Sequence, residues 1–298
     1  MQPRDLDYFR IIADHGHLGR AASTLGLSQP ALTKSLQRLE KELGAQLFER
    51  TPKGVRLTPV GAALRVRAAQ VERALNHARD EVADLVAGRA GTVRLGIGPT
   101  LIDLLLPVAL ATLLERLPEV TVRVVTALND VLLTQLTRGD LDLLLCTLPD
   151  APPHGMTLEL LFDDELAVVA RKGHPLARRR QIPLEELARQ RWVLPSSTVL
   201  SRRALEYCLE SGGGATPETV IETNSVPLLF SVVARTDLLS YQSLRALQSS
   251  PDRAQVRVLD VPVLKRRRRV GLVYRPDNYF PRAALGLMAL LRETARAL

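Results

Sequence analysis

The sequence predicts a helical N-terminal domain with a β-hairpin, then a long helix, then a C-terminal α/β region. Helix-like segments joined by a glycine-containing turn lie within residues 18–43, and a Pro/Gly turn follows at 51–54. Regular apolar spacing continues from Pro59 to Leu85, and beyond residue 91 strand-like and helix-like segments alternate. These patterns are typical of a winged helix-turn-helix and of an α/β unit with a largely parallel sheet.

Length and composition indicate an ordinary globular chain of more than one domain. It has 298 residues, of which 46% are hydrophobic and 24% charged, as is usual for globular proteins. The apolar run at 101–114 contains Asp103 and Pro107 and is too short to cross a bilayer. The first residues lack a signal-peptide pattern. We therefore expect no membrane partner and a cytoplasmic location, with Cys146 and Cys208 as reduced thiols packed in a core.

Basic residues are in excess and are concentrated near the N-terminus. The formal net charge is +8 and the sequence pI is near 10.0, which favours a polyanionic partner but also suits solubility. Between residues 28 and 57, six basic side chains stand against three acidic ones. This local excess is more informative than the global one.

Three short helices are predicted before residue 45. Apolar residues recur every three positions up to Gly16, and a second helix with small residues ends at Gly26. Ser28 is a suitable N-cap for the third helix, and Pro30 fits its first turn. The buried stripe of that helix is predicted to consist of Leu32, Leu36, Leu39 and Leu43. Gly44 would end the helix.

In a helix-turn-helix the second helix of the pair enters the DNA major groove. Gln29 suits an adenine edge, and Pro30 or the Thr33 methyl suits a thymine methyl. Lys34 and Arg38 suit phosphates, which set register and supply salt-dependent affinity. The predicted DNA-binding residues are Ser28, Gln29, Pro30, Thr33, Lys34 and Arg38 on the helix, with Arg50, Lys53 and Arg56 on the hairpin wing. The alternative is a helix and a hairpin that are merely solvated. The combination of a basic helix, a tight turn and a basic wing disfavours it.

Two stretches resemble a known family. The string "SQPALTKSLQRLEKELGAQLFER" is similar to the winged helix-turn-helix of LysR-type transcriptional regulators, although "GHLGRAA" departs from the usual Ser and Phe there. "ARKGHPLA" followed by "IPLEELARQRWVLP" resembles the two-lobed effector-binding domain of the same family. The resemblance implies a DNA-binding domain at 1–58, a linker and dimerisation helix at 59–90, and an effector-binding domain at 91–298. Its lobes would be 91–164 with 267–298, and 165–266.

The long helix carries a narrow apolar seam that suits a partner helix. Its members, at steps of four and three, are Val60, Leu64, Ala68, Val71, Leu75, Ala78, Val82 and Leu85. In the resembled family this helix pairs two subunits. We therefore expect a homodimer or homotetramer that reads two-fold-related half-sites on promoter DNA.

Ligands of α/β sheets bind beyond the carboxyl ends of strands, where helix N-termini favour anions. The candidate effector-binding residues are Thr100, Asn129 and Thr147 on the first lobe and Ser196, Thr198 and Ser225 on the second. Each is also an ordinary turn or N-cap residue. A carboxylate effector fits them, and a neutral polar molecule stays open, because no buried cation is evident among them. The "KRRRR" run at 265–269 is interpreted as a solvated hinge surface or a contact between subunits.

No pattern indicates an enzyme, a cofactor or a metal site. The histidines show no metal-ligand spacing, Gly-x-Ser-x-Gly is missing, and "GIGPTL" matches a dinucleotide-binding fingerprint only weakly. The second hypothesis is a solute-binding protein whose N-terminal domain contacts another protein. It predicts no loss of DNA affinity when Gln29, Lys34 or Arg38 is changed.

Overall fold

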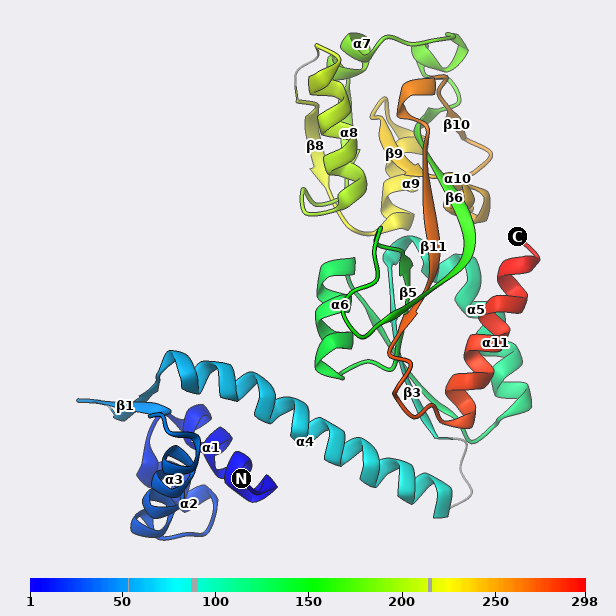
Figure 1. Cartoon of the computed structure of the whole chain (residues 1–298). Helices are drawn as coiled ribbons and strands as arrows, with labels where there is room; N and C mark the ends of the chain where they lie inside the picture. Colours follow the sequence, from blue (N-terminus) through cyan, green and yellow to red (C-terminus); the bar gives the residue numbers. More distant parts are fainter. Residues whose placement is uncertain (53, 87–90, 214–215) are drawn as a thin grey trace. The chain divides into compact units, whose positions relative to one another are not determined.

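A computed structural model describes residues 1–52, 54–86, 91–213 and 216–298. The chain divides into two compact units, an N-terminal one up to the end of the long helix and a C-terminal one that holds most of the remaining chain. The helices and strands of both units are labelled in Figure 1. Within the described residues, no helix is both long and apolar enough to cross a membrane.

The N-terminal unit is built on α1 (Pro3–His15), α2 (Leu18–Thr24) and α3 (Gln29–Leu43). Their apolar faces share one core with residues of the hairpin, in which Phe9 and Phe48 pack at 5.3 Å between ring centroids. Ser28 caps α3, and Gly44 ends it in the left-handed conformation with φ 67°. Leu43 was expected in the buried stripe but is 39% exposed. This residue lies in the last turn of α3, where the chain already leaves the core.

The wing is the antiparallel hairpin of β1 (Phe48–Thr51) and β2 (Gly54–Leu57), as the sequence predicts. Gly54 lies against the turn after α1, where an added Cβ would come within 2.2 Å of the Gly16 carbonyl oxygen. The Val55 amide donates to that same oxygen at 2.8 Å. Glycine at 54 therefore holds the wing close to the helices. Lys53 lies outside the described residues.

Helix α4 (Pro59–Val86) has two distinct parts. Leu64 and Ala68 pack against the core of the three helices. Farther along the seam, Val71 and Leu75 are each 39% exposed, and the side chain of Leu85 lies outside the described part. The pairing of this seam with a second helix stays a prediction.

The C-terminal unit contains a mixed seven-stranded sheet, in the order β10-β6-β11-β5-β3-β4, with β9 also paired to β6. Only β3 (Thr92–Ile97), β4 (Thr121–Thr126) and β5 (Leu143–Thr147) run parallel to one another in it. The expectation of a largely parallel sheet is therefore wrong. The error arose because the long strands β6 (Thr157–Arg171) and β11 (Arg266–Tyr274) pair antiparallel with each other, and β11 also pairs antiparallel with β5.

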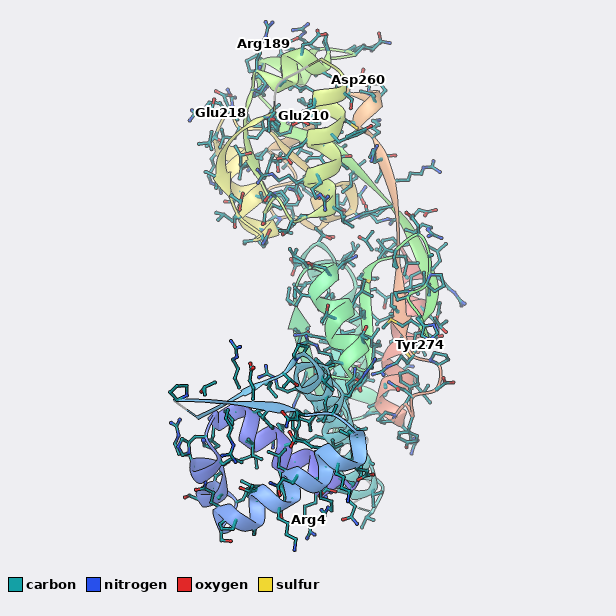
Figure 2. The ribbon with its side chains drawn as sticks, turned by 60° about the vertical axis from the view of Figure 1, so that its left-hand side comes forward. Arg4, Arg189, Glu210, Glu218, Asp260 and Tyr274 are labelled. Atoms are coloured by element: carbon teal, nitrogen blue, oxygen red, sulfur yellow. The ribbon has the colours of Figure 1, made fainter. Side chains whose placement is uncertain are left out.

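Helices α5 (Ile102–Arg116) and α11 (Arg282–Arg296) pack with one part of the sheet into a first core, lobe I. Helix α6 (Asn129–Arg138) covers a smaller apolar cluster in the same lobe. Tyr274, labelled in Figure 2, lies at the end of β11. Its ring packs edge-on against that of Phe280, with the ring centroids 5.7 Å apart. Apolar faces of α5 and α11 thus pack against the sheet in this core.

A second core, lobe II, surrounds Trp192, whose indole N–H donates to the Leu187 carbonyl at 3.2 Å. It is built on the parallel pair β7 (Arg191–Leu194) and β8 (Glu218–Glu222), with β9 (Ser240–Ser243) and β10 (Val256–Val258) along β6. The helices of this lobe are α7 (Leu184–Ala188), α8 (Leu200–Ser211), α9 (Val226–Arg235) and α10 (Leu244–Ser249). Strands β6 and β11 run side by side from one lobe to the other (Figure 1).

Candidate functional site

The exposed face of α3 carries the predicted DNA-binding residues. Gln29, Pro30 and Lys34 are exposed, and the half-buried Thr33 donates its hydroxyl hydrogen to the Gln29 carbonyl at 2.9 Å. Ser28 uses its side chain to accept from the Ala31 amide at 3.4 Å, so it acts as the helix cap. Among the described residues, Lys34 makes no ion pair, which leaves its charge available to an incoming phosphate.

Arg38 is held on this face by a buried acid that sequence reasoning did not single out. Its guanidinium donates to the carboxylate of Asp5 on α1, which is 4% exposed and also accepts from Ser35 at 3.4 Å. Burial raises the pKa of Asp5, but the Gln2 amide and the Arg38 guanidinium outweigh it, so the pKa lies below its usual 3.8. Arg38 itself stays 59% exposed and can still contact a phosphate.

The two described arginines of the wing differ in whether an acidic neighbour compensates their charge. Arg56 on β2 faces Glu49 on β1 in the strand register, and its guanidinium binds that carboxylate at 2.7 Å. Arg50 is exposed and, among the described residues, makes no ion pair. Of the two described wing arginines, Arg50 is therefore the one whose charge is uncompensated.

On lobe I, the predicted residues Thr100, Asn129 and Thr147 are brought together around Arg268. The guanidinium of Arg268 donates to the Thr100 hydroxyl at 3.1 Å and to the Thr147 hydroxyl at 3.5 Å. The Asn129 side-chain amide donates to the Thr147 carbonyl at 2.7 Å. The strands β3 and β5 and the N-terminus of α6 therefore deliver these side chains to one place, as their shared position after strands predicted.

Arg268 corrects two expectations. It belongs to the "KRRRR" run, in which Arg266, Arg267 and Arg269 are exposed as predicted, yet its own side chain is only 14% exposed. It also places a cation beside the effector-binding candidates Thr100 and Thr147, where the sequence had indicated none. Side chains alternate along β11, so Arg268 is turned inward while Arg267 and Arg269 on either side of it are exposed.

The partner of Arg268 is Asp164, its direct neighbour on β6 in the strand register. Asp164 accepts from Arg268 Nε and Nη2 at 2.8 and 2.7 Å on one oxygen. Its other oxygen accepts from the Glu165 amide at 2.9 Å and the Ser243 hydroxyl at 3.0 Å. The carboxylate side chain is 0% exposed. These hydrogen bonds hold the Asp164 carboxylate, and the carboxylate in turn fixes the arginine in place.

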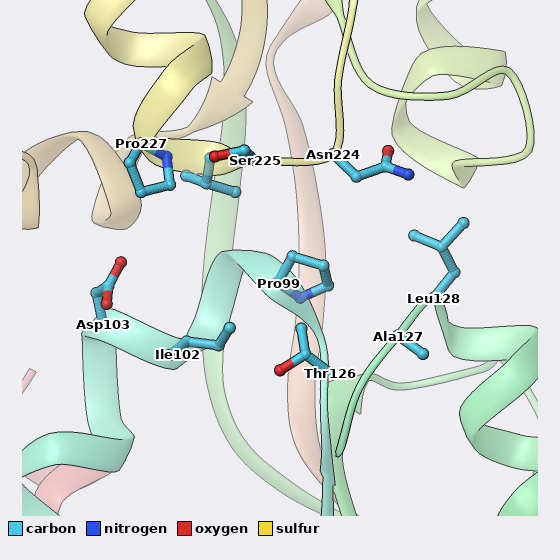
Figure 3. A pocket seen from close by; sticks show the side chains of 10 residues that line it. Pro99, Ile102, Asp103, Thr126, Ala127, Leu128, Asn224, Ser225 and Pro227 are labelled. Carbon is cyan, nitrogen blue, oxygen red and sulfur yellow. The ribbon is translucent and has the colours of Figure 1, made fainter. Parts of the chain in front are cut away.

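A cavity of about 420 Å³ lies between the two lobes, and Figure 3 shows residues of both facing it. Lobe I contributes the end of β4 and the first turn of α5, with Thr126 and Asp103 as polar groups. Lobe II contributes the N-terminus of α9, with Asn224 and Ser225. The rest of the lining is apolar: Pro99, Ile102, Ala127, Leu128, Val226 and Pro227.

Of the predicted effector residues, this cavity directly includes Ser225, which also caps α9 by accepting from the Leu228 amide at 3.4 Å. Thr100 directly follows Pro99, and Asn129 directly follows Leu128, both of which line the cavity. Sequence reasoning missed Asp103, Thr126 and Asn224, although Asn224 directly precedes the cap and Thr126 ends a strand. These two positions, before a helix cap and at a strand end, were the sequence signals that could have identified Asn224 and Thr126.

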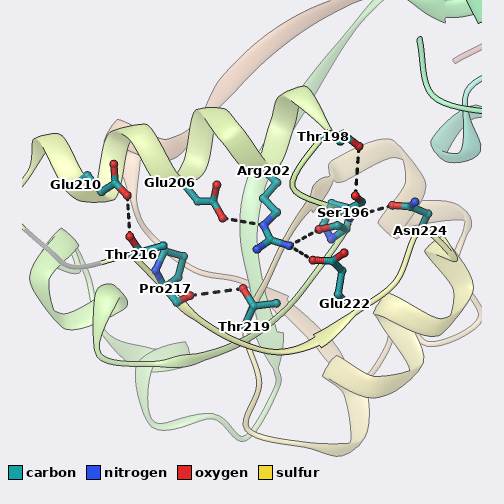
Figure 4. Close-up of polar contacts among 11 residues, drawn as sticks. Ser196, Thr198, Arg202, Glu206, Glu210, Thr216, Pro217, Thr219, Glu222 and Asn224 are labelled. Atoms are coloured by element: carbon teal, nitrogen blue, oxygen red, sulfur yellow. Dashed lines mark hydrogen bonds and ion pairs between the residues drawn. The ribbon is translucent and has the colours of Figure 1, made fainter. Parts of the chain in front are cut away.

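Ser196 and Thr198 lie on a lobe II loop that Arg202 holds (Figure 4). Their hydroxyls are 3.2 Å apart, and the Ser196 amide donates to the Asn224 side-chain oxygen at 3.0 Å. Arg202 donates to the Pro195 carbonyl at 2.8 Å and binds Glu206 at 2.7 Å and Glu222 at 2.6 Å. The loop that carries Ser196 is thus tied to both α8 and β8.

The cysteines lie in different cores. Cys146 is buried in β5, and burial raises the pKa of its thiol to about 12. Cys208 on α8 is half-buried against the core of lobe II. In the part of the chain that the structure describes, no group of His, Cys, Asp and Glu is arranged to hold a metal ion.

Two family models match the chain, each over one of the regions just described. "Bacterial regulatory helix-turn-helix protein, lysR family" matches residues 3–62, and "LysR substrate binding domain" matches residues 87–296. This chain belongs to the LysR family. It is therefore a LysR-type DNA-binding transcriptional regulator with a C-terminal effector-binding domain, a class that works on DNA as oligomers with small-molecule effectors.

Individual relatives agree with this family. The chain is 31% identical over 281 residues to "DNA-binding transcriptional dual regulator OxyR" of Escherichia coli K12, covering 93% of the chain and 90% of the relative. It is 31% identical to "HTH-type transcriptional regulator GalR" of Pseudomonas putida, covering 98% and 74%. The relatives are regulators, and the hypothesis of a solute-binding protein with a protein-contact domain is not supported.

Solved structures show the same LysR fold. A full-length OxyR variant from Pseudomonas aeruginosa is 26% identical, with a TM-score of 0.62 over 99% of this chain and 95% of that one. CbnR in complex with its target DNA has a TM-score of 0.66 over 99% and 100% of the two chains. At 19% identity the CbnR likeness shows the fold alone.

Proposed function

We propose that this LysR-type regulator reads double-stranded DNA with the exposed face of α3 and grips the backbone with the wing. The observation that carries the proposal is the division of α3, whose leucines except the terminal Leu43 are buried, while Gln29, Lys34 and Arg38 are exposed. Gln29 would contact a base edge, and Lys34, Arg38 and Arg50 would contact phosphates. Lys53 and Arg56 would contact phosphates of the DNA backbone as well. The ion pair with Glu49 reduces the contribution expected of Arg56.

We further propose that α4 joins two subunits along its exposed seam. Val71, Leu75 and Val82 are exposed there, and a narrow stripe of this kind is the geometry of two paired helices. A dimer would read two half-sites and gain affinity from their linkage. The proposed limits remain 1–58 for DNA binding, 59–90 for the linker helix and 91–298 for the effector-binding domain.

The effector is assigned to the region between the lobes of the C-terminal unit. Thr100, Asn129 and Thr147 would serve lobe I, and Ser196, Thr198 and Ser225 would serve lobe II. An effector that contacts both lobes better in one arrangement shifts the protein toward it, and only that difference in affinity can alter DNA binding. No reaction is assigned to this site: its contacts are those of binding, and the chain's relatives are regulators.

Thiol oxidation is a second way to control such a protein, because some relatives are named hydrogen peroxide-inducible genes activators. The cysteines of this chain disfavour it. The thiolate is the reactive form, and burial raises the pKa of Cys146 to about 12, while Cys208 packs against the other lobe's core. We propose that binding, rather than oxidation, carries the signal. Peroxide treatment followed by operator titration would contradict this if it changed DNA affinity in a way that a thiol reductant reverses.

The test of the regulator's function is capture of genomic fragments on the purified full-length protein at near-physiological salt. Enrichment of a few sites with a two-fold-related motif is expected, and the Gln29→Ala protein should lose that enrichment while keeping weak binding to bulk DNA. If the wild type enriches nothing over bulk DNA, with and without metabolite extract, the α3 face is not a sequence reader. Calorimetric titrations showing that effector and operator affinities are uncoupled would contradict only the control mechanism.

A further inference from the structure

Helix α10 packs in lobe II but also contacts lobe I. Its residues Ala246 and Leu247 are buried in an apolar cluster that includes the core-facing residues of α9. Arg245, which directly precedes them, has its guanidinium over the ring of Phe162, 5.1 Å from the ring centroid. Phe162 belongs to the core of lobe I. Consecutive residues of one short helix therefore contact opposite lobes.

Arg245 makes two further contacts, and their acceptors lie on different elements. Its Nε donates to the Asp163 carbonyl on β6 at 3.2 Å. Its Nη1 donates to the Leu298 carbonyl, just beyond the end of α11, at 3.0 Å, and Figure 1 shows α10 beside that end. A guanidinium is planar, and its donors point in fixed directions. Both acceptors must therefore keep their positions relative to α10 if the two hydrogen bonds are to persist.

The start of α10 is fixed to the same segment of β6. Ser243 caps the helix by accepting from an amide of the first turn at 3.1 Å, and its hydroxyl donates to the buried carboxylate of Asp164 at 3.0 Å. Strand β6 passes between the lobes here, since Phe162 belongs to the core of lobe I and Leu166 to that of lobe II. Three consecutive residues of β6, 162–164, thus hold α10 at the crossing.

We propose that Arg245 is a positioning residue that ties the two lobes together and sets the angle between them. Two paired strands twist easily, so β6 and β11 alone would restrain rotation of one lobe against the other only weakly. The contact with Leu298 lies off these strands and opposes that rotation. A rotation driven by an effector then has to strain or break the contacts of Arg245, which contribute to the free-energy difference between the two arrangements. The tie needs no ligand, so it can be tested on the protein alone.

The experiment measures distances between the lobes of the full-length protein by pulsed electron paramagnetic resonance. Spin labels are attached through Thr134→Cys on α6 of lobe I and Arg203→Cys on α8 of lobe II, both at exposed positions. Cys208→Ala removes the half-buried native thiol, and the buried Cys146 is kept. Labelled protein is diluted into an excess of unlabelled protein, so that only distances within one chain are recorded. With Arg245 in place, a single narrow distance distribution is expected.

Arg245→Met keeps an unbranched apolar stem and removes the charge and every donor, and it should broaden the distribution about twofold. Arg253→Met is the matched control: this exposed arginine donates to the Gln248 carbonyl at 3.3 Å, within lobe II, and its loss should leave the distribution unchanged. Arg245→Lys loses the two-pronged contact but keeps the charge over the ring of Phe162, and it should also broaden the distribution. It decides the question if Arg245→Met does not fold.

Trp192 fluorescence shows whether each variant is folded and gives its unfolding temperature. A role in stability alone would lower this temperature in Arg245→Met and leave the distances between the lobes of the folded protein unchanged. That outcome, or equal broadening in Arg253→Met, would overturn the proposal. Operator affinity of the unlabelled wild type is measured alongside. If it persists while the distances do not respond to Arg245, the tie between the lobes is wrong and the DNA-binding function stands.

Discussion

The guanidinium of Arg38, on the solvent face of α3, is bound to the buried carboxylate of Asp5 on α1. Helix α1 thus supports a side chain of α3 that we propose contacts DNA. The same carboxylate also accepts from the Gln2 amide at 3.1 Å, which ties it to the start of α1.

Asp5→Asn should therefore destabilise the N-terminal unit by about 1 kcal/mol at neutral pH, since a charged hydrogen-bond acceptor is lost and Arg38 is largely exposed. The pKa of Asp5 is lowered from 3.8, so its contribution is present above that pH and disappears as the pH falls through the lowered pKa. Hydrogen exchange of the α1 and α3 amides measures the effect. Asp7→Asn, which breaks a partly exposed pair with Arg10, is the control and should cost less.

Lys34→Ala should weaken binding about equally on specific and non-specific DNA. A phosphate contact carries no sequence information, and its loss should reduce the slope of log affinity against log salt by about one. Arg189→Ala, at an exposed position of the C-terminal unit (Figure 2), removes the same charge from the chain without touching α3. If both variants change the slope alike, net charge rather than a contact explains the effect.

Glu49→Gln should tighten DNA binding by about two- to fivefold at low salt. The substitution frees Arg56, which Glu49 now neutralises across the hairpin, and removes a negative charge that would face phosphates. Binding isotherms at low and high salt measure this, and the gain should shrink as salt rises. An affinity that is unchanged at low salt would show that the wing lies away from the DNA backbone.

His174→Asn should flatten the pH dependence of the stability of lobe II. Burial lowers the pKa of His174 from 6.5, with the nearby Asp237 opposing and Arg171 assisting the shift. The unfolded chain then binds a proton that the folded chain refuses, so wild-type stability falls as the pH drops below 6.5 toward the lowered pKa. Asparagine can still accept from the Leu176 amide, which His174 now does at 3.1 Å.

The measurement is denaturant unfolding followed by Trp192 fluorescence at about pH 7.5 and about pH 5.5, where one histidine contributes up to about 1.4 kcal/mol per pH unit. His154→Asn, at an exposed position, is the matched control. A wild-type stability that does not change across this interval would refute the assignment.

Local patterns were enough to predict the N-terminal unit. The cap at Ser28, the end of α3 at Gly44 and the pairing of β1 with β2 follow from interactions within a few residues of the chain, and the structure confirms each one. Leu43 was misplaced because helical spacing gives the face of a residue but not where the core stops. The ion pairs of Arg38 and Arg56 were not predicted, because their partners lie on other elements.

In the C-terminal unit the sequence predicted alternating strands and helices and placed Thr100, Asn129 and Thr147 after strands, where the structure brings them together. It did not predict the mixed sheet, since strand direction depends on pairing between distant segments. Arg268 was not singled out because the other four residues of the "KRRRR" run are also basic, and the run was interpreted as one solvated surface.

By itself, the sequence determined the helix-turn-helix, the wing and the family, because caps, turns and apolar periods act over short distances. Only the tertiary structure decided the polarity and charge of the region between the lobes. Asp164 and Arg268 are 104 positions apart, and their pairing exists only because β6 and β11 lie side by side in one register. The donors of Arg268 then reach Thr100 and Thr147 across that sheet, a relationship that no local pattern encodes.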